Sequence, residues 1–196
     1  MRIHTAEKAV FSIDYPLRII DNNHRSSFWR RTMRIGIISD SHDHHQNILK
    51  AVKIFREQKV DYVFHAGDII SPFAAKAFSE VKGSKFIAVF GNNDGEKLIL
   101  ASTIKGFGGE IYEGPHTTET AGRKIFITHK PGALDEVISS GRYHLVIYGH
   151  THKQDIRTVG KTLVINPGES TDWLTENPGI VVLELDNMSV EEFSLR

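Results

Sequence analysis

The stretch Arg34-Ile-Gly-Ile-Ile-Ser-Asp40-Ser-His42 joins an apolar run to a carboxylate and an imidazole. The run has the nearly continuous apolar character of a strand that is buried on both faces. Such strands belong to parallel sheets, whose faces are covered by crossover helices. Asp40 and His42 are alternate residues at the end of the run and can bind one ion together. The stretch therefore predicts an α/β fold with a polar site at the end of a strand.

The same alternation of strand and helix continues along the chain. Apolar residues at helical spacing predict a helix near residues 45–58, and a proline in the first turn predicts another that opens at Ser71-Pro72. Strands are expected at 62–66 and 86–90, and a further helix at about 96–104. The second half is mostly strand, with short β-rich runs at 125–128, 145–148, 155–159, 162–165, 180–185 and 190–193. The whole pattern predicts two packed sheets flanked by helices.

Composition limits the classes of protein and of site that the chain can form. Its 196 residues suit one domain, and 40 % hydrophobic with 24 % charged residues is typical of a globular protein. With no cysteine, a bound metal must use carboxylate, imidazole or amide ligands. We see neither a spanning segment nor a signal peptide, so a cytoplasmic location is expected. The formal net charge of zero argues against a nucleic-acid partner.

Residues 1–32 do not follow the alternation of strand and helix. They hold six Lys/Arg and three Asp/Glu, whereas the rest of the chain is net acidic. One interpretation is an extension outside the domain, produced by translation that starts upstream of Met33. The other is a docking arm that uses residues 28–31. We therefore predict a domain over residues 33–196, preceded by an extension of unknown role.

Five apolar runs end in residues that can bind a metal ion. Because the carboxyl ends of parallel strands meet along one crevice, we expect these side chains to converge. The seven predicted ligands are Asp40, His42, Asp68, Asn92, His129, His150 and His152.

Each of these motifs also has a purely structural explanation, such as a helix cap or a turn. By that reasoning His65 is expected to be a core histidine, and His116 and His144 loop or surface residues. All five runs together are hard to explain in this way. Seven donors are too many for one ion and suit two ions, with Asp68 as the natural bridging carboxylate. Two such ions can hold a hydroxide between them for in-line attack on a phosphoryl group.

In their order along the chain, these motifs resemble those of the calcineurin-like metallophosphoesterases, and within them the small YfcE-like phosphodiesterases. The resemblance includes the tail motif Ile165-Asn-Pro-Gly168-Glu-Ser170 and covers residues 33 to about 194. It implies a four-layer α/β/β/α sandwich with two mixed sheets. It also implies how the ligands divide: Asp40, His42, Asp68 and His152 on one ion, and Asp68, Asn92, His129 and His150 on the other.

Asn93 and Asp94 are the predicted catalytic positions. Many relatives have a histidine where this chain has Asn93, and an amide cannot act as a general acid near neutral pH. Lys130 follows His129 where relatives have glycine, and we interpret it as a solvated side chain rather than a phosphate ligand.

The expected function is hydrolysis of a small phosphodiester with two divalent ions. The mixed ligand set favours Mn²⁺, with Ni²⁺, Mg²⁺, Zn²⁺ or Fe²⁺ as alternatives. The main alternative function is a protein-binding scaffold, because a retromer subunit shares this fold. A nuclease is a weaker alternative, since the chain lacks a basic stripe. The sequence allows a homo-oligomer without predicting one, and it does not identify the substrate.

Overall fold

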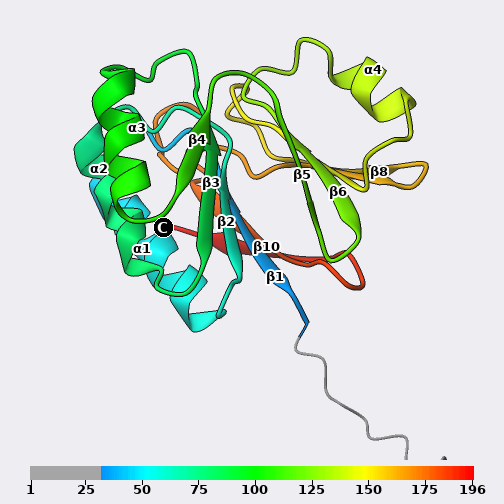
Figure 1. Ribbon diagram of the computed structural model, residues 1–196, viewed down its shortest axis with the longest axis horizontal. Coiled ribbons are helices and arrows are strands. Elements are labelled where there is room, and N and C mark those ends of the chain that lie inside the picture. Colours follow the sequence, from blue (N-terminus) through cyan, green and yellow to red (C-terminus); the bar gives the residue numbers. More distant parts are fainter. Residues whose placement is uncertain (1–31) are drawn as a thin grey trace, which may run out of the picture. The chain divides into compact units, whose positions relative to one another are not determined.

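The strand of the quoted motif, β1 (Arg34–Ile38), lies inside a six-stranded sheet of order β11-β10-β1-β2-β3-β4. The computed structural model describes residues 32–196 (Figure 1). Strands β1 to β4 are parallel, β10 is antiparallel to β1, and β11 is antiparallel to β10. The other strands of this sheet are β2 (Tyr62–His65), β3 (Lys85–Val89), β4 (Glu110–Tyr112), β10 (Gly179–Glu184) and β11 (Ser189–Ser194).

The second sheet has five strands in the order β5-β6-β7-β9-β8. Its three central strands are parallel, and an antiparallel strand lies at each edge, so this sheet is also mixed. Its strands are β5 (His116–Thr120), β6 (Arg123–Ile127), β7 (Leu145–Ile147), β8 (Asp155–Val159) and β9 (Thr162–Asn166).

The two sheets pack face to face, and helices cover their outer faces (Figure 1). Side chains such as Ile35, Ile125 and Ile147 form the core between the sheets. The outer face of the six-stranded sheet packs against α1 (His45–Glu57), α2 (Pro72–Lys76), the 3₁₀ turn η1 (Ala77–Glu80) and α3 (Lys97–Gly106). The other sheet packs against α4 (Leu134–Ser139). The predicted four-layer α/β/β/α sandwich is confirmed.

Local sequence explains where the first helices begin and how closely they pack. The Nδ1 atom of His44 accepts a hydrogen bond from the backbone N–H of Asn47, and so caps α1. Ser71 caps α2 in the same way, with Pro72 in the first turn. Gly36 of β1 has no side chain, which leaves room for the ring of Phe55 on α1 to lie against the sheet.

Three elements were not predicted from the sequence. β4 and α4 are short, and β5 has no apolar alternation because its sequence is His-Thr-Thr-Glu-Thr. His116, expected in a loop, opens β5 and is stacked on Tyr112. Such strands form because neighbouring strands offer backbone hydrogen bonds, which a local pattern does not reveal. The two interpretations of residues 1–32 fall almost wholly outside the described residues. Within residues 32–196, no helix has the length and apolar character needed to cross a membrane.

Candidate metal centre

The seven predicted ligands lie together where strands of both sheets end. Asp40 and His42 follow β1, Asp68 follows β2 and Asn92 follows β3, all in the six-stranded sheet. The other three follow the facing sheet, with His129 after β6 and His150 and His152 after β7. The two parallel arrays thus bring residues from five separate segments to one place.

Asp68 lies between histidines that come from different sheets. Its Oδ2 atom is 3.5 Å from Nε2 of His42 and 3.4 Å from Nε2 of His129. On the other side, Nε2 of His152 is 3.5 Å from Oδ1 of Asp40. These separations exceed a normal hydrogen bond and leave ligand atoms facing one another.

Two groups of ligand atoms are compact enough to surround an ion. The first consists of Asp40, His42 and His152, and the second of Asp40, Asp68 and His129, with the atoms of each group within 4.8 Å of one another. Asn92 adjoins the second group, because its Oδ1 atom is 3.0 Å from Nε2 of His129. The two groups share Asp40 and are therefore adjacent.

Among the groups found in residues 32–196, neither includes His150, which lies beside them. Its ring centroid is 5.1 Å from that of His129, edge to face. Its backbone N–H donates to both carboxylate oxygens of Asp40, at 3.0 and 3.2 Å. The residue thus holds Asp40 through its backbone, while its exposed ring remains next to the second group.

The hydrogen bonds of the histidines leave Nε2 atoms available for a cation. Nδ1 of His129 donates to the carbonyl oxygen of Ala66 at 2.8 Å, and Nδ1 of His152 donates to Glu169 at 2.9 Å. In a neutral imidazole the other nitrogen then carries the lone pair. Nε2 of His42 is buried and has no hydrogen-bond partner among residues 32–196. A buried polar atom without a partner is costly, and a bound cation would satisfy it.

The electrostatics of the cluster favour a positive charge. Burial raises the pKa of the Asp68 carboxyl, but the nearby imidazole of His129 and the hydrogen bonds from Asn93 outweigh burial and hold the pKa below its usual range. Burial lowers the pKa of His129, yet Asp68 and the carbonyl of Ala66 raise it overall. Burial raises the pKa of Asp40 above its usual range. The negative potential that raises the pKa of His129 is the same potential that would attract a divalent ion.

The backbone around the cluster is strained and closely packed. Asp40, Asp68, His150 and His152 all adopt left-handed conformations, with φ of 50°, 58°, 70° and 60°. Such conformations cost energy in non-glycine residues and collect at functional sites. A Cβ atom added to Gly149 would lie 2.0 Å from Oγ of Ser39, so a glycine is required there for the two sheets to approach.

Asn93 is exposed and Asp94 is buried, and both are hydrogen-bonded to the segment that carries Asp68. The backbone N–H and the Nδ2 group of Asn93 each donate to a different oxygen of Asp68, both at 2.8 Å. The buried carboxylate of Asp94 accepts from the backbone N–H groups of Asp68, Ile70 and Gly91. Both side chains are therefore engaged in holding the loop that carries Asp68.

Other predicted residues lie where the sequence suggested. His65 is fully buried, with Nε2 3.0 Å from Oγ of Ser41 and with Nδ1 accepting from the backbone N–H of Gly67. It is thus a satisfied core histidine, as predicted. Lys130 is exposed and borders a cavity of about 470 Å³ beside Asn92 and His129.

Glu169 is the main residue of the centre that sequence reasoning missed. Its buried carboxylate accepts from Nδ1 of His152 and from the hydroxyl group of Thr171 at 2.8 Å. It also accepts from the backbone N–H of Leu174 and from the N–H and hydroxyl of Thr175. Burial raises its pKa, but these hydrogen bonds lower it to about 2. The only signal in the sequence was its place in the tail motif, which gave it no role.

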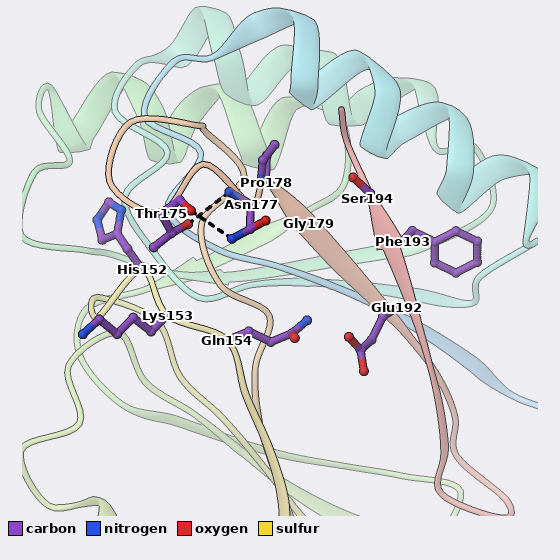
Figure 2. Close-up of a pocket in the computed structure, with 10 residues that line it drawn as sticks. All are labelled: His152, Lys153, Gln154, Thr175, Asn177, Pro178, Gly179, Glu192, Phe193 and Ser194. Carbon is purple, nitrogen blue, oxygen red and sulfur yellow. Dashed lines mark hydrogen bonds between the residues drawn. The ribbon is translucent and has the colours of Figure 1, made fainter.

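A cavity of about 550 Å³ lies next to this part of the centre. Figure 2 shows His152 at the left of this cavity, Thr175 and Asn177 above it, and residues 192–194 of β11 at the right. Two hydrogen bonds join Asn177 to Thr175, one from its backbone N–H and one from Nδ2.

Comparisons with known proteins find similar phosphoesterases. A phosphodiesterase of Methanocaldococcus jannaschii, MJ0936, is 42 % identical over 166 residues, which are 83 % of this chain and 99 % of that protein. A solved structure of a novel archaeal phosphodiesterase is 40 % identical, covers 83 % of this chain and 99 % of its own, and has a TM-score of 0.79. YfcE, a phosphoesterase from E. coli, shares the fold at 16 % identity and a TM-score of 0.59. The alignment covers 84 % of this chain and 100 % of the YfcE chain.

Residues 33–188 match the calcineurin-like phosphoesterase superfamily domain, which accounts for most of the chain. The match includes all seven predicted ligands and the tail motif that holds Glu169. The chain is therefore a hydrolase that belongs to the calcineurin-like phosphoesterase superfamily.

Proposed function

We propose that this chain hydrolyses a small phosphodiester with the help of two divalent metal ions. The observation that carries the proposal is the position of Asp68, which is 3.5 Å from His42 and 3.4 Å from His129. One carboxylate between two sets of imidazoles is the arrangement that a pair of ions requires. The 42 % identity to a protein named as a phosphodiesterase supports the diester over other phosphate esters.

We assign the seven ligands to two positions. Asp40, His42 and His152 form the first, and Asp68 joins them because its Oδ2 atom is 3.5 Å from Nε2 of His42. His129 and Asn92 adjoin Asp68 on the other side, and the exposed ring of His150 completes that position. Oxygen and nitrogen donors without thiolate favour Mn²⁺, with Ni²⁺, Mg²⁺, Zn²⁺ or Fe²⁺ as alternatives.

When bound, such ions lower the pKa of water and neutralise the charge of the phosphoryl oxygens. The residues of the chain hold this centre in place. Glu169 and the carbonyl of Ala66 keep the protons of His152 and His129 on Nδ1, which directs Nε2 into the cluster. Asn93 and Asp94 keep Asp68 in its strained conformation through hydrogen bonds to its side chain and backbone.

The preferred substrate is a diester with a good leaving group. The amide of Asn93 donates to Asp68 and cannot protonate a leaving oxygen, which an acid would assist by about 10² to 10⁴-fold. Rates should therefore be highest on aryl diesters such as bis(p-nitrophenyl) phosphate. They should fall steeply as the pKa of the leaving group rises.

The decisive experiment is a panel of phosphodiesters and phosphomonoesters on metal-stripped protein refilled with Mn²⁺, Ni²⁺, Mg²⁺ or Zn²⁺. We expect no hydrolysis after chelation, recovery with Mn²⁺, and two ions per chain by elemental analysis. Full activity in protein without metal would refute the two-metal mechanism. No hydrolysis of any diester in fully loaded protein would favour the protein-binding scaffold instead.

A further inference from the structure

The loop of residues 169–177, called here the Glu169 loop, carries two large apolar side chains into solvent beside the metal centre. Trp173 is 60 % exposed and Leu174 is 71 % exposed. The ring centroid of Trp173 is 5.7 Å from that of His42, with 41° between the ring planes. An exposed indole thus lies in contact with a predicted metal ligand.

The Glu169 loop is anchored on both sides of Trp173. Before it, Glu169 accepts hydrogen bonds from His152 and Thr171, and Ser170 donates from its hydroxyl group to the carbonyl of Ser39 at 2.8 Å. After it, the backbone N–H groups of Leu174 and Thr175 both donate to Glu169. The carboxylate therefore fixes the backbone around Trp173 and the ring of His152 at the same time.

The far end of the Glu169 loop is held as well. Asn177 is bonded to Thr175, as Figure 2 shows, and the guanidinium of Arg196 donates to the carbonyl of Glu176 and to Oδ1 of Asn177. Asp172 lies 3.9 Å from Nε2 of His44, next to the segment that carries His42. These contacts fix the backbone of the Glu169 loop, while the indole of Trp173 stays exposed.

An exposed apolar side chain gains about 25 cal/mol for each square ångström of apolar surface that a bound group covers. A tryptophan that is already positioned loses little entropy when a flat group stacks on it. The phosphoryl group of a substrate must lie at the metal centre, so its ester arms extend from there. The indole next to His42 is a surface that one of those arms can reach.

We propose that Trp173 is a stacking subsite for a planar group, an aryl ring or a nucleobase, on one ester arm of the substrate. This inference rests on the proposed function, because it takes the phosphoryl group to lie at the metal centre. It narrows the substrate class from any small phosphodiester to diesters with a ring close to the phosphorus.

The test measures binding without turnover, with phenylphosphonate and methylphosphonate as stable probes on Mg²⁺-loaded full-length chain. Trp173 is one of two tryptophans, so Trp29→Phe leaves it as the only indole. Phenylphosphonate should change the emission of Trp173 and bind about five- to tenfold more tightly than methylphosphonate, the range expected for one stacked ring. Thymidine 5′-monophosphate against ribose 5-phosphate then distinguishes a nucleobase from a simple aryl group.

Calorimetry on Trp173→Ala should show equal affinity for the two phosphonates, whereas Trp173→Phe should keep most of the preference. Val159→Ala removes an exposed apolar side chain at the other end of the second sheet and should leave the preference unchanged. Equal binding of both phosphonates to the parent, or a preference that survives in Trp173→Ala, overturns the subsite. A change of oligomeric state in Trp173→Ala without any change in affinity also overturns the subsite. A preserved preference in protein that hydrolyses no diester would refute the proposed function alone.

Discussion

Asp68 shows how much a single carboxylate contributes to the proposed centre. Its Oδ2 atom faces His42 and His129, and both of its oxygens accept hydrogen bonds from Asn93. The sequence identified it as a ligand because it follows a buried strand. Its position between imidazoles of opposite sheets depends on the packing of those sheets.

Asp68→Asn keeps the shape of this side chain and removes its negative charge. We expect loading to fall below two ions per chain, and turnover to fall by at least about 10²-fold, since several kcal/mol of charge stabilisation are lost. Elemental analysis and kinetics on bis(p-nitrophenyl) phosphate measure the two effects. Asp186→Asn makes the same chemical change in the distant turn after β10 and should alter neither. Normal loading in Asp68→Asn would contradict a bridging role.

His65 makes the stability of the fold depend on pH. Burial lowers its pKa to about 3, so the folded protein keeps a neutral imidazole while the unfolded chain takes up a proton near pH 6.5. Above pH 6.5 the imidazole is neutral in both states, and the free energy of unfolding is highest. As the pH falls towards 3, only the unfolded chain takes up the proton, so the free energy of unfolding declines by up to about 1.4 kcal/mol per pH unit.

His65→Gln should reduce this dependence between pH 7 and pH 5. The measurement is the free energy of unfolding in urea for metal-free protein, so that loss of metal does not contribute. Equal pH slopes for the parent and the variant would show that other groups control acid unfolding.

At the scale of elements, the Glu169 loop joins two parts of the centre that no local pattern connects. Glu169 and His152 are 17 residues apart, and β8 and β9 lie between them in the chain. The backbone N–H of Glu169 also donates to the carbonyl of His152. The loop therefore fixes His152 through its backbone and its ring together.

Glu169→Gln replaces one carboxylate oxygen with an NH₂ group, which cannot accept a hydrogen bond. Either the bonds from His152 and Thr171 to Oε2, or those from Leu174 and Thr175 to Oε1, are then lost or reversed. We expect the affinity for the ion next to His152 to fall by about 10- to 100-fold, as with other residues that orient metal-binding histidines. Co²⁺ absorption titrations measure this without turnover. Thr171→Val removes one hydroxyl and leaves the carboxylate, so it should cause a smaller loss. Equal Co²⁺ affinities in Glu169→Gln and the parent would exclude the positioning role.

At the scale of the whole molecule, all of the proposed ligands, and the residues that hold them, lie within residues 33–196. Deletion of residues 1–32 should therefore leave turnover on a small diester within about twofold of the parent, since it removes no catalytic group. Steady-state kinetics and a thermal unfolding curve measure the outcome. A truncated protein that folds but loses activity would assign residues 1–32 a role in the reaction.

The sequence by itself determined the fold class, the four layers and the identity of the seven candidate ligands. Each of these depends on local order along the chain, because a buried strand followed by a ligand residue places that residue at the carboxyl edge of a parallel sheet. The first strand, the first helix and the run of short strands in the second half were predictable for the same reason.

The tertiary structure alone decided how these residues act together. The contact of Trp173 with His42, the hydrogen bonds of Glu169, and the engagement of Asn93 with Asp68 join residues that are distant in the chain. The polar edge strand β5 likewise forms only because β6 lies next to it. Contacts of this kind arise from pairing and packing between segments, and no periodicity within a single segment encodes them.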